Sequence, residues 1–291
     1  MQQFNPEIIR QLYIPPHNSH KGQNGKLMIV GGSHLFHAAS LWALEIASRI
    51  VDMVFYSSVP ENNDIVQKNK EAFRGGIVVK RADLENYMEE AECVLIGPGM
   101  VRSESPISND KFPISHVEDI DKIEDEGIQT RELTRYLLGK YPQKKWVIDA
   151  GALQMMDPQW LKPLNGNVVL TPHKLEFERL FGSKATEETV SQKAKDYNAI
   201  ILVKGEEDIV CSATQCVRIS GGNAGMTKGG TGDILAGLIA ALACKNDLWI
   251  SALAGSYINK KAGESLFEKV GYTFNASDLA TEIPHVMKKE I

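Results

Sequence analysis

The sequence predicts an α/β protein in which helices cover both faces of one mostly parallel sheet, a three-layer α/β/α arrangement. Short apolar runs of strand length, such as residues 93–96 (CVLI), lack polar alternation, which is typical of strands buried on both faces. Segments with helical periodicity lie between most of these runs. The alternation continues across the middle of the chain without a linker, so residues 1–291 are expected to form a single domain.

The elements can be placed in order along the chain. Strands are expected at residues 26–32, 53–59, 77–80, 93–96, 146–149, 167–171 and 200–204, followed by a hairpin over residues 208–218. Helices are expected at residues 38–51, 82–91, 129–141, 232–243, 247–270 and 277–289. Thr171 is expected to cap the helix after residues 167–171, with Pro172 as its first residue. Ser277 or Asp278 is expected to cap the last helix.

Composition and charge exclude several classes of protein. The net charge is −5 and there is no basic tract, which argues against nonspecific nucleic-acid binding. No apolar stretch is long enough for a membrane span and no secretory signal is visible, so a cytoplasmic location is expected.

Cys93, Cys211 and Cys244 lie in apolar runs and are expected to be reduced core thiols. Residues 103–129 are polar, acidic and long for a connection, so a surface insertion is predicted there.

The sequence GGTGD at residues 229–233 indicates a phosphate site at the start of a helix. The first amides of a helix have no partner within it, and the helix dipole adds positive potential there. Asp233 would repel a phosphate, so its presence indicates a hydroxyl group about to join that phosphate. We expect the helix start to keep Asp233 ionised, so that it accepts the hydroxyl proton.

The alternative structural interpretation is that Thr231 or Asp233 merely caps the helix while the glycines form a turn. Six of the twelve residues at 221–232 are glycine, and the helix begins with small and apolar residues (ILAGLIAALA), which favours a binding site. The pattern does not match a P-loop, and no convincing dinucleotide-binding fingerprint follows the first strand.

The segment NAGMTKGGTGDILAG (residues 223–237) resembles the signature of the NAD(P)H-hydrate dehydratases, a branch of the ribokinase-like fold. Matching blocks follow the family order: HKGQNGKLMIVGGS (20–33), LIGPGM (95–100), VIDAGAL (147–153), LTPHKLEFERLF (170–181) and LVKG (202–205). The resemblance implies a ribokinase-like fold and a carbon–oxygen lyase. Its members use ADP or ATP with Mg²⁺ to phosphorylate the ring hydroxyl in the S form of hydrated NADH or NADPH. Phosphate elimination then restores the dinucleotide.

The resemblance also implies site residues. Asp233 would accept the hydroxyl proton, and the main chain of Gly230, Thr231 and Gly232 would hold the phosphoryl group. Contacts to the hydrated dinucleotide are implied for Ala39, Gly99, His173 and Asp233. Contacts to the nucleotide are implied for Lys204, Gly205, Glu206, Glu207, Asp208 and Gly232. Glu176 is a candidate contact to Mg²⁺ through water, with a solvated helix face as the alternative. Asp149 is expected to have a supporting role.

Several of these positions have a plainer interpretation or depart from the family pattern. His173 alone is equally consistent with a helix-start hydrogen bond, and Lys204 alone with a solvated lysine at a strand end. Met100 stands where the family continues with Gly, and Gly151 where it often has a second Asp. Asp208 replaces a Thr, so it adds negative charge and cannot donate a hydroxyl hydrogen bond.

Two further functions remain open. A small-alcohol kinase of the same superfamily, of the hydroxyethylthiazole or sugar kinase type, also uses GTGD, and a nucleotide-binding regulator without turnover is a third possibility. The TPH block and the NAGMTKGG context favour the dehydratase, and the intact Asp233 argues against the regulator. The resemblance also implies a homo-oligomer. The residues before the HKG block are too few for the family's epimerase domain, so the epimerase is expected to be a separate protein.

Overall fold

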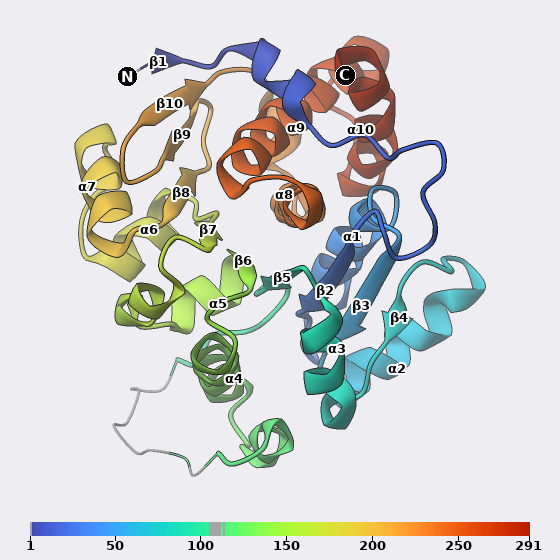
Figure 1. Cartoon of the computed structure of the whole chain (residues 1–291), viewed down its shortest axis with the longest axis vertical. Coiled ribbons are helices and arrows are strands. Elements are labelled where there is room, and N and C mark those ends of the chain that lie inside the picture. The colour runs from blue at the N-terminus through green and yellow to red at the C-terminus, as the bar shows by residue number, and fades with distance from the viewer. Residues whose placement is uncertain (1, 105–111, 113) are drawn as a thin grey trace.

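The strands of the central sheet are apolar on both faces because helices cover them on both sides. The computed structural model describes residues 2–104, 112 and 114–291. In this part of the chain one sheet of ten strands has the order β1-β10-β9-β8-β7-β6-β5-β2-β3-β4 (Figure 1). The strands are β1 (Gln2–Gln3), β2 (Lys26–Val30), β3 (Met53–Ser57), β4 (Ile77–Val78), β5 (Cys93–Ile96), β6 (Lys145–Ile148), β7 (Val168–Leu170), β8 (Ile200–Val203), β9 (Asp208–Cys211) and β10 (Cys216–Ile219). Strands β2 to β8 pair in parallel, while β9 pairs antiparallel with β8 and β10, which confirms the predicted hairpin.

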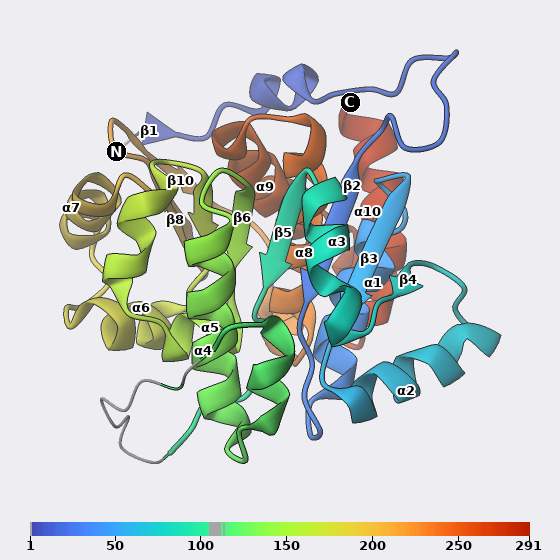
Figure 2. The same ribbon diagram turned by 60° about the horizontal axis from the view of Figure 1, so that its bottom comes forward.

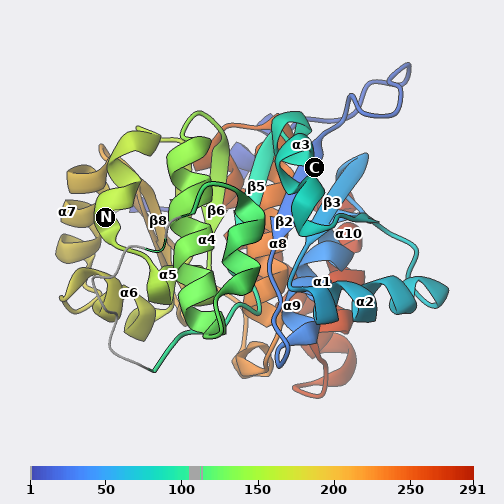
Figure 3. The ribbon, with the colours of Figure 1, turned by 90° about the horizontal axis from the view of Figure 1, so that it is seen from below.

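Helices form a layer on each face of this sheet. On one face α1 (His37–Ala47), α8 (Thr231–Lys245) and α9 (Leu248–Val270) pack against the strands, and α10 (Ala276–Glu290) packs outside them. The other face is covered by α3 (Leu84–Glu90), α4 (Glu126–Lys140), α5 (Ala150–Met155), α6 (Lys174–Phe181) and α7 (Glu187–Tyr197), while α2 (Pro60–Lys68) lies near β4 (Figures 2 and 3). No helix of the described residues is long and apolar enough to cross a bilayer.

Strand β5 shows how the sequence builds two cores. Val94 and Ile96 pack into the apolar cluster below α3 to α7, whereas Cys93 and Leu95 pack into the cluster below α1, α8 and α9. All four side chains are fully buried. The absence of polar alternation in CVLI therefore has the predicted cause, because both faces of the strand need apolar side chains.

The strand order reverses between β2 and β5. From β2 the chain moves outward to β3 and β4, and from β5 it moves the other way to β6, β7 and β8. The loops after the carboxyl ends of β2 and β5 therefore leave in opposite directions, which opens the crevice where ligands bind in open α/β sheets. Loops after β6, β7 and β8 lie along the same edge.

One prediction about the cysteines is wrong. Cys93 and Cys244 are free and buried, as expected. Cys211, however, forms a disulfide with Cys216. The two residues lie directly opposite each other in the register of β9 and β10, and this proximity across the hairpin is not visible in their sequence spacing alone.

The predicted cap of the last helix is also wrong. Asn275 caps α10, and its side chain accepts hydrogen bonds from the amides of Ser277 and Asp278 at 2.8 and 3.2 Å. The carboxylate of Asp278 in return accepts a hydrogen bond from the amide of Asn275. This reciprocal pairing fixes the helix start before both predicted caps.

The described part of the predicted insertion 103–129 contacts the core. Residues 105–111 and 113 lie outside the described residues. Val117 and Ile120, in a short 3-10 helix (Val117–Lys122), are buried in the cluster below α3 to α7. The last residues of the segment, from Glu126, begin α4.

Candidate active site

The glycine-rich segment predicted as a phosphate site forms the start of α8. Gly230 precedes the first turn with a φ of 96°, a conformation that favours glycine, and a Cβ there would lie 2.4 Å from the ring of Trp42. The hydroxyl of Thr231 donates to the carbonyls of Met226 (2.6 Å) and Lys228 (3.0 Å). The N-cap residue of α8 is Gly230, which has no side chain, so neither Thr231 nor Asp233 is the cap that the alternative interpretation assumed. The amide of Thr231 lies 3.4 Å from the carbonyl oxygen of Lys228, a long contact, so an anion at this helix start would be held mainly by the neighbouring amides of Gly230 and Gly232.

Lys204 brings a positive charge to the same place. It follows β8, and its Nζ lies 2.8 Å from Oδ1 of Asp149, which follows β6. A Cβ on Gly232 would lie 3.4 Å from this Nζ, so the ammonium group stands beside the first turn of α8. Burial opposes the charge of Lys204, but the carboxylates of Asp149 and Glu176 raise its pKa above the usual value. With a side chain that is 20% exposed and paired, Lys204 is not a solvated strand-end lysine.

Asp233 lies in the first turn of α8, and the expectation that the helix keeps it ionised is wrong. Burial raises the pKa of Asp233 to about 7, and the charge of Asp149 adds to this increase, while Lys204 opposes it. Loss of hydration and a neighbouring carboxylate thus raise the pKa of Asp233 by more than the positive potential of the helix start lowers it. Since Asp233 changes protonation near neutral pH, its carboxylate can accept a proton at one step and return it at a later one.

His173 follows β7 and caps α6, so the prediction of Thr171 as cap and Pro172 as first helical residue is wrong. The Nδ1 of His173 accepts a hydrogen bond from the amide of Glu176 at 3.2 Å, and Glu176 Oε2 accepts one from the amide of His173 at 2.9 Å. The other carboxylate oxygen of Glu176 accepts a hydrogen bond from Gln154. Glu176 is buried, so its assignment to a solvated helix face is also wrong.

Ala39 and Gly99 lie together where the strand order reverses. A Cβ on Gly99, which follows β5, would lie 3.1 Å from the Cβ of Ala39 in α1 and 2.6 Å from the carbonyl oxygen of Phe36. The amide of Gly32, after β2, donates to the carbonyl of Pro98 at 2.7 Å and joins the ends of the two strands. The fold thus places Ala39 and Gly99 side by side at the strand-order reversal.

Met100 and Gly151, two of the residues that depart from the family pattern, contact each other. A Cβ on Gly151 would lie 2.1 Å from the carbonyl oxygen of Met100, closer than any side chain tolerates. The path of the loop at Met100 and the absence of a side chain at position 151 are therefore coupled.

A pocket of about 640 Å³ opens beside the start of α8, within the range of small-molecule sites. We call it the α8–α9 pocket; it is lined by His173, Lys204, Gly205, Glu206, Asp208, Gly221, Gly222, Asn223, Ala224, Met226, Thr227, Thr231, Gly232, Leu235, Asn259 and Lys260. Lys204 and Gly232 form its charged end. Most of the predicted nucleotide contacts line this pocket, together with His173.

The carboxylate of Asp208 is held in a buried network and is not directed at a ligand as a free charge. The Nζ of Lys260 in α9 lies 3.3 Å from Oδ1 of Asp208 and donates to the carbonyls of Gly205 (3.0 Å) and Gly221 (3.3 Å). Asp208 accepts hydrogen bonds from the amide of Gly205 and the hydroxyl of Ser256. Lys260 thus neutralises the charge that replaces the family's Thr, and it ties two edges of the pocket together.

For the nucleotide that the resemblance implies in this pocket, replacing Lys260 by methionine is expected to raise KM about tenfold and to lower Tm, because Asp208 is left buried without its partner. Turnover at saturating nucleotide is expected to change little. The double variant Lys260→Met/Asp208→Asn removes both charges and is expected to recover most of the lost Tm. Steady-state kinetics and thermal unfolding test this, and an unchanged KM for Lys260→Met would restrict the pair to a structural role.

Sequence reasoning missed Lys260 and the pairing of Lys204 with Asp149. Lys260 lies in a helix with several other polar residues, Lys261 and Glu264 among them, so the sequence does not single it out, although its side chain is buried. The pair of Lys204 and Asp149 joins two strand ends that are far apart in the sequence.

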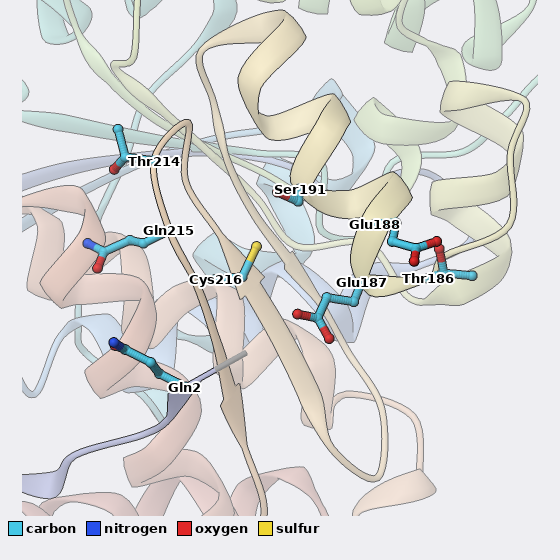
Figure 4. A pocket seen from close by; sticks show the side chains of 8 residues that line it. All are labelled: Gln2, Thr186, Glu187, Glu188, Ser191, Thr214, Gln215 and Cys216. Carbon is cyan, nitrogen blue, oxygen red and sulfur yellow. The ribbon is translucent and has the colours of Figure 1, made fainter.

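A larger concavity, of about 930 Å³, lies elsewhere, between α7, the end of the β9–β10 hairpin and β1 (Figure 4). The side chains that line it are Gln2, Thr186, Glu187, Glu188, Ser191, Thr214, Gln215 and Cys216. None of these described residues belongs to the predicted site, and the concavity is wide and open to solvent.

Comparison with solved structures defines the class of fold. A ribokinase-like superfamily protein from Enterococcus faecalis matches with a TM-score of 0.80 and 21% identity, over 99% of this chain and 96% of that one. The ADP/ATP-dependent NAD(P)H-hydrate dehydratase from Bacillus subtilis, co-crystallised with ATP and Mg²⁺, matches with a TM-score of 0.76 and 21% identity, over 100% of this chain and 99% of that one. The fold is therefore ribokinase-like, as expected.

The family follows from sequence comparison. The model of the NAD(P)H-hydrate dehydratase family matches residues 27–285, and the chain belongs to this family. It is 32% identical to the ADP-dependent (S)-NAD(P)H-hydrate dehydratase of Nitrosopumilus maritimus, over 95% of this chain and 93% of that one. It is 33% identical to the bifunctional NAD(P)H-hydrate repair enzyme Nnr of Methanocaldococcus jannaschii, over 93% of this chain but only 50% of that one. The chain thus spans about half the length of the bifunctional relatives.

Proposed function

We propose that this chain repairs hydrated NADH and NADPH. With ADP or ATP it phosphorylates the ring hydroxyl of the S form and then eliminates phosphate, which restores the dinucleotide. The observation that carries this proposal is Asp233, a carboxyl group at an uncapped helix start beside the ammonium group of Lys204. A carboxylate next to a phosphate site is unfavourable unless a proton donor lies between them. The name of the Nitrosopumilus maritimus relative supports the same reaction.

Each substrate has its own part of the site in this proposal. The nucleotide occupies the α8–α9 pocket, where Lys204, Gly205, Glu206, Asp208 and Gly232 contact it. Glu207 does not line this pocket, and its carboxylate pairs with Arg218 and Ser220, so only its main chain is proposed as a contact. The hydrated dinucleotide approaches from the strand-order reversal, where Ala39 and Gly99 lie, and extends to His173 and Asp233 beside the start of α8. The two ligands then meet at the start of α8.

The chemical step uses the groups at that start. Asp233 takes the proton of the ring hydroxyl as the oxygen–phosphorus bond forms and the bond to the nucleotide breaks. The main-chain amides of Gly230, Thr231 and Gly232 hold the transferred phosphoryl group, because the helix start favours negative charge. Protonated Asp233 then returns to the carboxylate form near neutral pH, since its pKa is about 7. The carbon–oxygen bond to phosphate then breaks while the adjacent ring carbon loses a proton to solvent, and this elimination regenerates the double bond.

Mg²⁺ is proposed as the metal of the reaction. Magnesium in such sites is held by one or two carboxylates, water and the substrate phosphates. Asp149 supplies a carboxylate beside the phosphate position, with one oxygen paired to Lys204, and Glu176 is proposed to contact the ion through water. A bound Mg²⁺ would offset the negative charge of the phosphates.

We propose a cytoplasmic homo-oligomer that works with a separate NAD(P)H-hydrate epimerase. The bifunctional name of the longer archaeal relatives supports a link between two repair activities. We also propose that the protein binds neither nucleic acid nor membranes, in line with its net charge of −5.

One assay tests the function directly. The purified protein is mixed with hydrated NADH, Mg²⁺ and ADP or ATP, and recovery of the near-ultraviolet absorbance of reduced nicotinamide is followed. We expect recovery that depends on the nucleotide. Phosphorylation of hydroxyethylthiazole or a sugar in place of recovery would indicate the small-alcohol kinase, and nucleotide binding without turnover would indicate the regulator.

The pH dependence of this assay is a second prediction. Asp233 must be ionised to accept a proton, and burial raises its pKa to about 7. The kcat/KM for hydrated NADH is therefore expected to fall about tenfold per pH unit below about pH 7 and to level off above it. A profile that stays flat down to about pH 5 would exclude Asp233 as the group that accepts the proton in the free enzyme.

A further inference from the structure

The disulfide between Cys211 and Cys216 lies at the wall of the concavity shown in Figure 4. Its two cysteines differ in their access to solvent. Cys211 is fully buried in the apolar cluster below α3 to α7, whereas Cys216 is half-buried and lines the concavity. A thiol from solvent therefore reaches this disulfide from one side, at Cys216.

Backbone pairing holds the two cysteines opposite each other, in addition to the disulfide. Cys211 and Cys216 form one of the four residue pairs that join β9 to β10. Beyond this pair the amide of Ser212 donates to the carbonyl of Gln215 at 2.8 Å and closes the turn. Strand β9 also pairs with β8 along its other edge. Opening the disulfide would therefore leave both sulfur atoms near each other, in position to bond again.

The concavity is lined by polar and acidic side chains. Glu187 and Glu188, at the start of α7, contribute two carboxylates, and none of the described residues that line the concavity is a lysine or an arginine. Arg218 lies 3.3 Å from the carboxylate of Glu187 and offsets its charge, so a net negative charge remains. Such a surface attracts a cationic ligand and repels an anionic one. Its volume of about 930 Å³ is sufficient for a small organic molecule.

We propose that the Cys211–Cys216 disulfide is a site of thiol–disulfide exchange, which a small, positively charged thiol enters through Cys216. The thiolate of the incoming molecule attacks Sγ of Cys216 and forms a mixed disulfide with it. The original sulfur–sulfur bond breaks, its electron pair passes to Sγ of Cys211, and that sulfur takes a proton. The reverse attack by Cys211 on Sγ of Cys216 expels the small thiol and restores the disulfide. The exchange therefore needs no further oxidant or reductant.

The first test compares two single variants that each leave one sulfur of the pair as a thiol. Cystamine, a small disulfide with two ammonium groups, is added to folded Cys211→Ser and to folded Cys216→Ser, and mass spectrometry follows the mixed disulfide. Cys211→Ser is expected to be labelled, at Cys216, at least about 100-fold faster than Cys216→Ser, because burial hinders both ionisation of and access to the Cys211 thiol. The double variant Cys211→Ser/Cys216→Ser keeps only the buried Cys93 and Cys244 and is expected to stay unlabelled.

Similar labelling rates for the two folded single variants would overturn the proposal, and so would the absence of label on folded Cys211→Ser. Thermal unfolding verifies that each variant is folded at the assay temperature. In guanidinium chloride both single variants are expected to react at similar rates, since the difference belongs to the fold. The unaltered protein, purified in air and unfolded without a reductant, is expected to show two free thiols, those of Cys93 and Cys244. Four free thiols would remove the disulfide on which the proposal depends.

The second test measures the preference for charge, with Cys211→Ser as the acceptor. The labelling rate with cystamine is compared with that of the disulfide of thioglycolate, which carries two carboxylates, and each rate is divided by the rate with free mercaptoethanol. Cystamine is expected to be favoured about three- to tenfold at low salt. The preference is expected to shrink when Glu188→Gln is added and to vanish at about 1 M salt, where the screening length is about 3 Å. Equal rates at low salt would overturn the positive charge assigned to the ligand.

Discussion

Replacing Asp233 by asparagine is expected to lower kcat for hydrated NADH by about 10²- to 10⁴-fold, the usual contribution of a positioned base. Asparagine has nearly the same size but does not accept the hydroxyl proton as a base. The KM for both substrates is expected to change only a few-fold, because the amides at the start of α8 and Lys204 remain. The measurement is nucleotide-dependent recovery of near-ultraviolet absorbance, and full turnover by the variant would remove Asp233 from the chemistry. Asp64→Asn, at an exposed position of α2, is the matched control.

The thermal stability of Asp233→Asn shows whether its loss of activity comes from the missing proton acceptor or from a damaged fold. The folded-state pKa of Asp233, about 7, lies above that of an unfolded aspartate. The folded protein therefore keeps a proton that the unfolded chain has already released, and burying the charge costs more free energy as pH rises toward about 7. Asparagine carries no charge to bury. The gain in Tm from Asp233→Asn is thus expected to be larger at about pH 8 than at about pH 5. An inactive variant that is destabilised at both values would contradict this account.

The fold was largely predictable because its signals are local. The run CVLI gave the bounds of β5, and the apolar C-terminal segments gave α8 to α10 to within a few residues. The errors occurred where side chains decide between neighbouring residues. His173 and Asn275 cap their helices through reciprocal hydrogen bonds. Propensity rules alone favour Thr171 over His173, and they do not separate Ser277 and Asp278 from Asn275.

The site was predictable in its residues but not in its electrostatics. The glycine-rich segment and the TPH block identified Asp233 and His173, because each motif is contiguous in the sequence. The charge of Asp233 depends instead on Asp149 and Lys204, which come from other strand ends, and on burial that no local pattern shows. Lys260 escaped notice for the same reason, since its partners, Asp208 at the start of β9 and the carbonyls of Gly205 and Gly221, are far away in the chain.

Replacing Lys204 by methionine is expected to lower kcat/KM by about 10²- to 10³-fold, because the pocket loses its cation and Asp149 is left buried without a partner. The acidic limb of the pH profile is expected to move to higher pH, since Lys204 lowers the pKa of Asp233. Asp149→Asn is expected to move it to lower pH, because Asp149 raises that pKa. Shifts in the same direction would contradict the assignment of opposite electrostatic roles.

The double variant Lys204→Met/Asp149→Asn distinguishes the structural part of this pair from its part in binding. Removing both charges leaves no orphan carboxylate, so Tm is expected to recover most of what Lys204→Met loses. Affinity for the nucleotide is not expected to recover, because the phosphate still lacks its cation. If nucleotide affinity returned together with Tm, Lys204 would act only by holding Asp149, and the helix start alone would bind the phosphate.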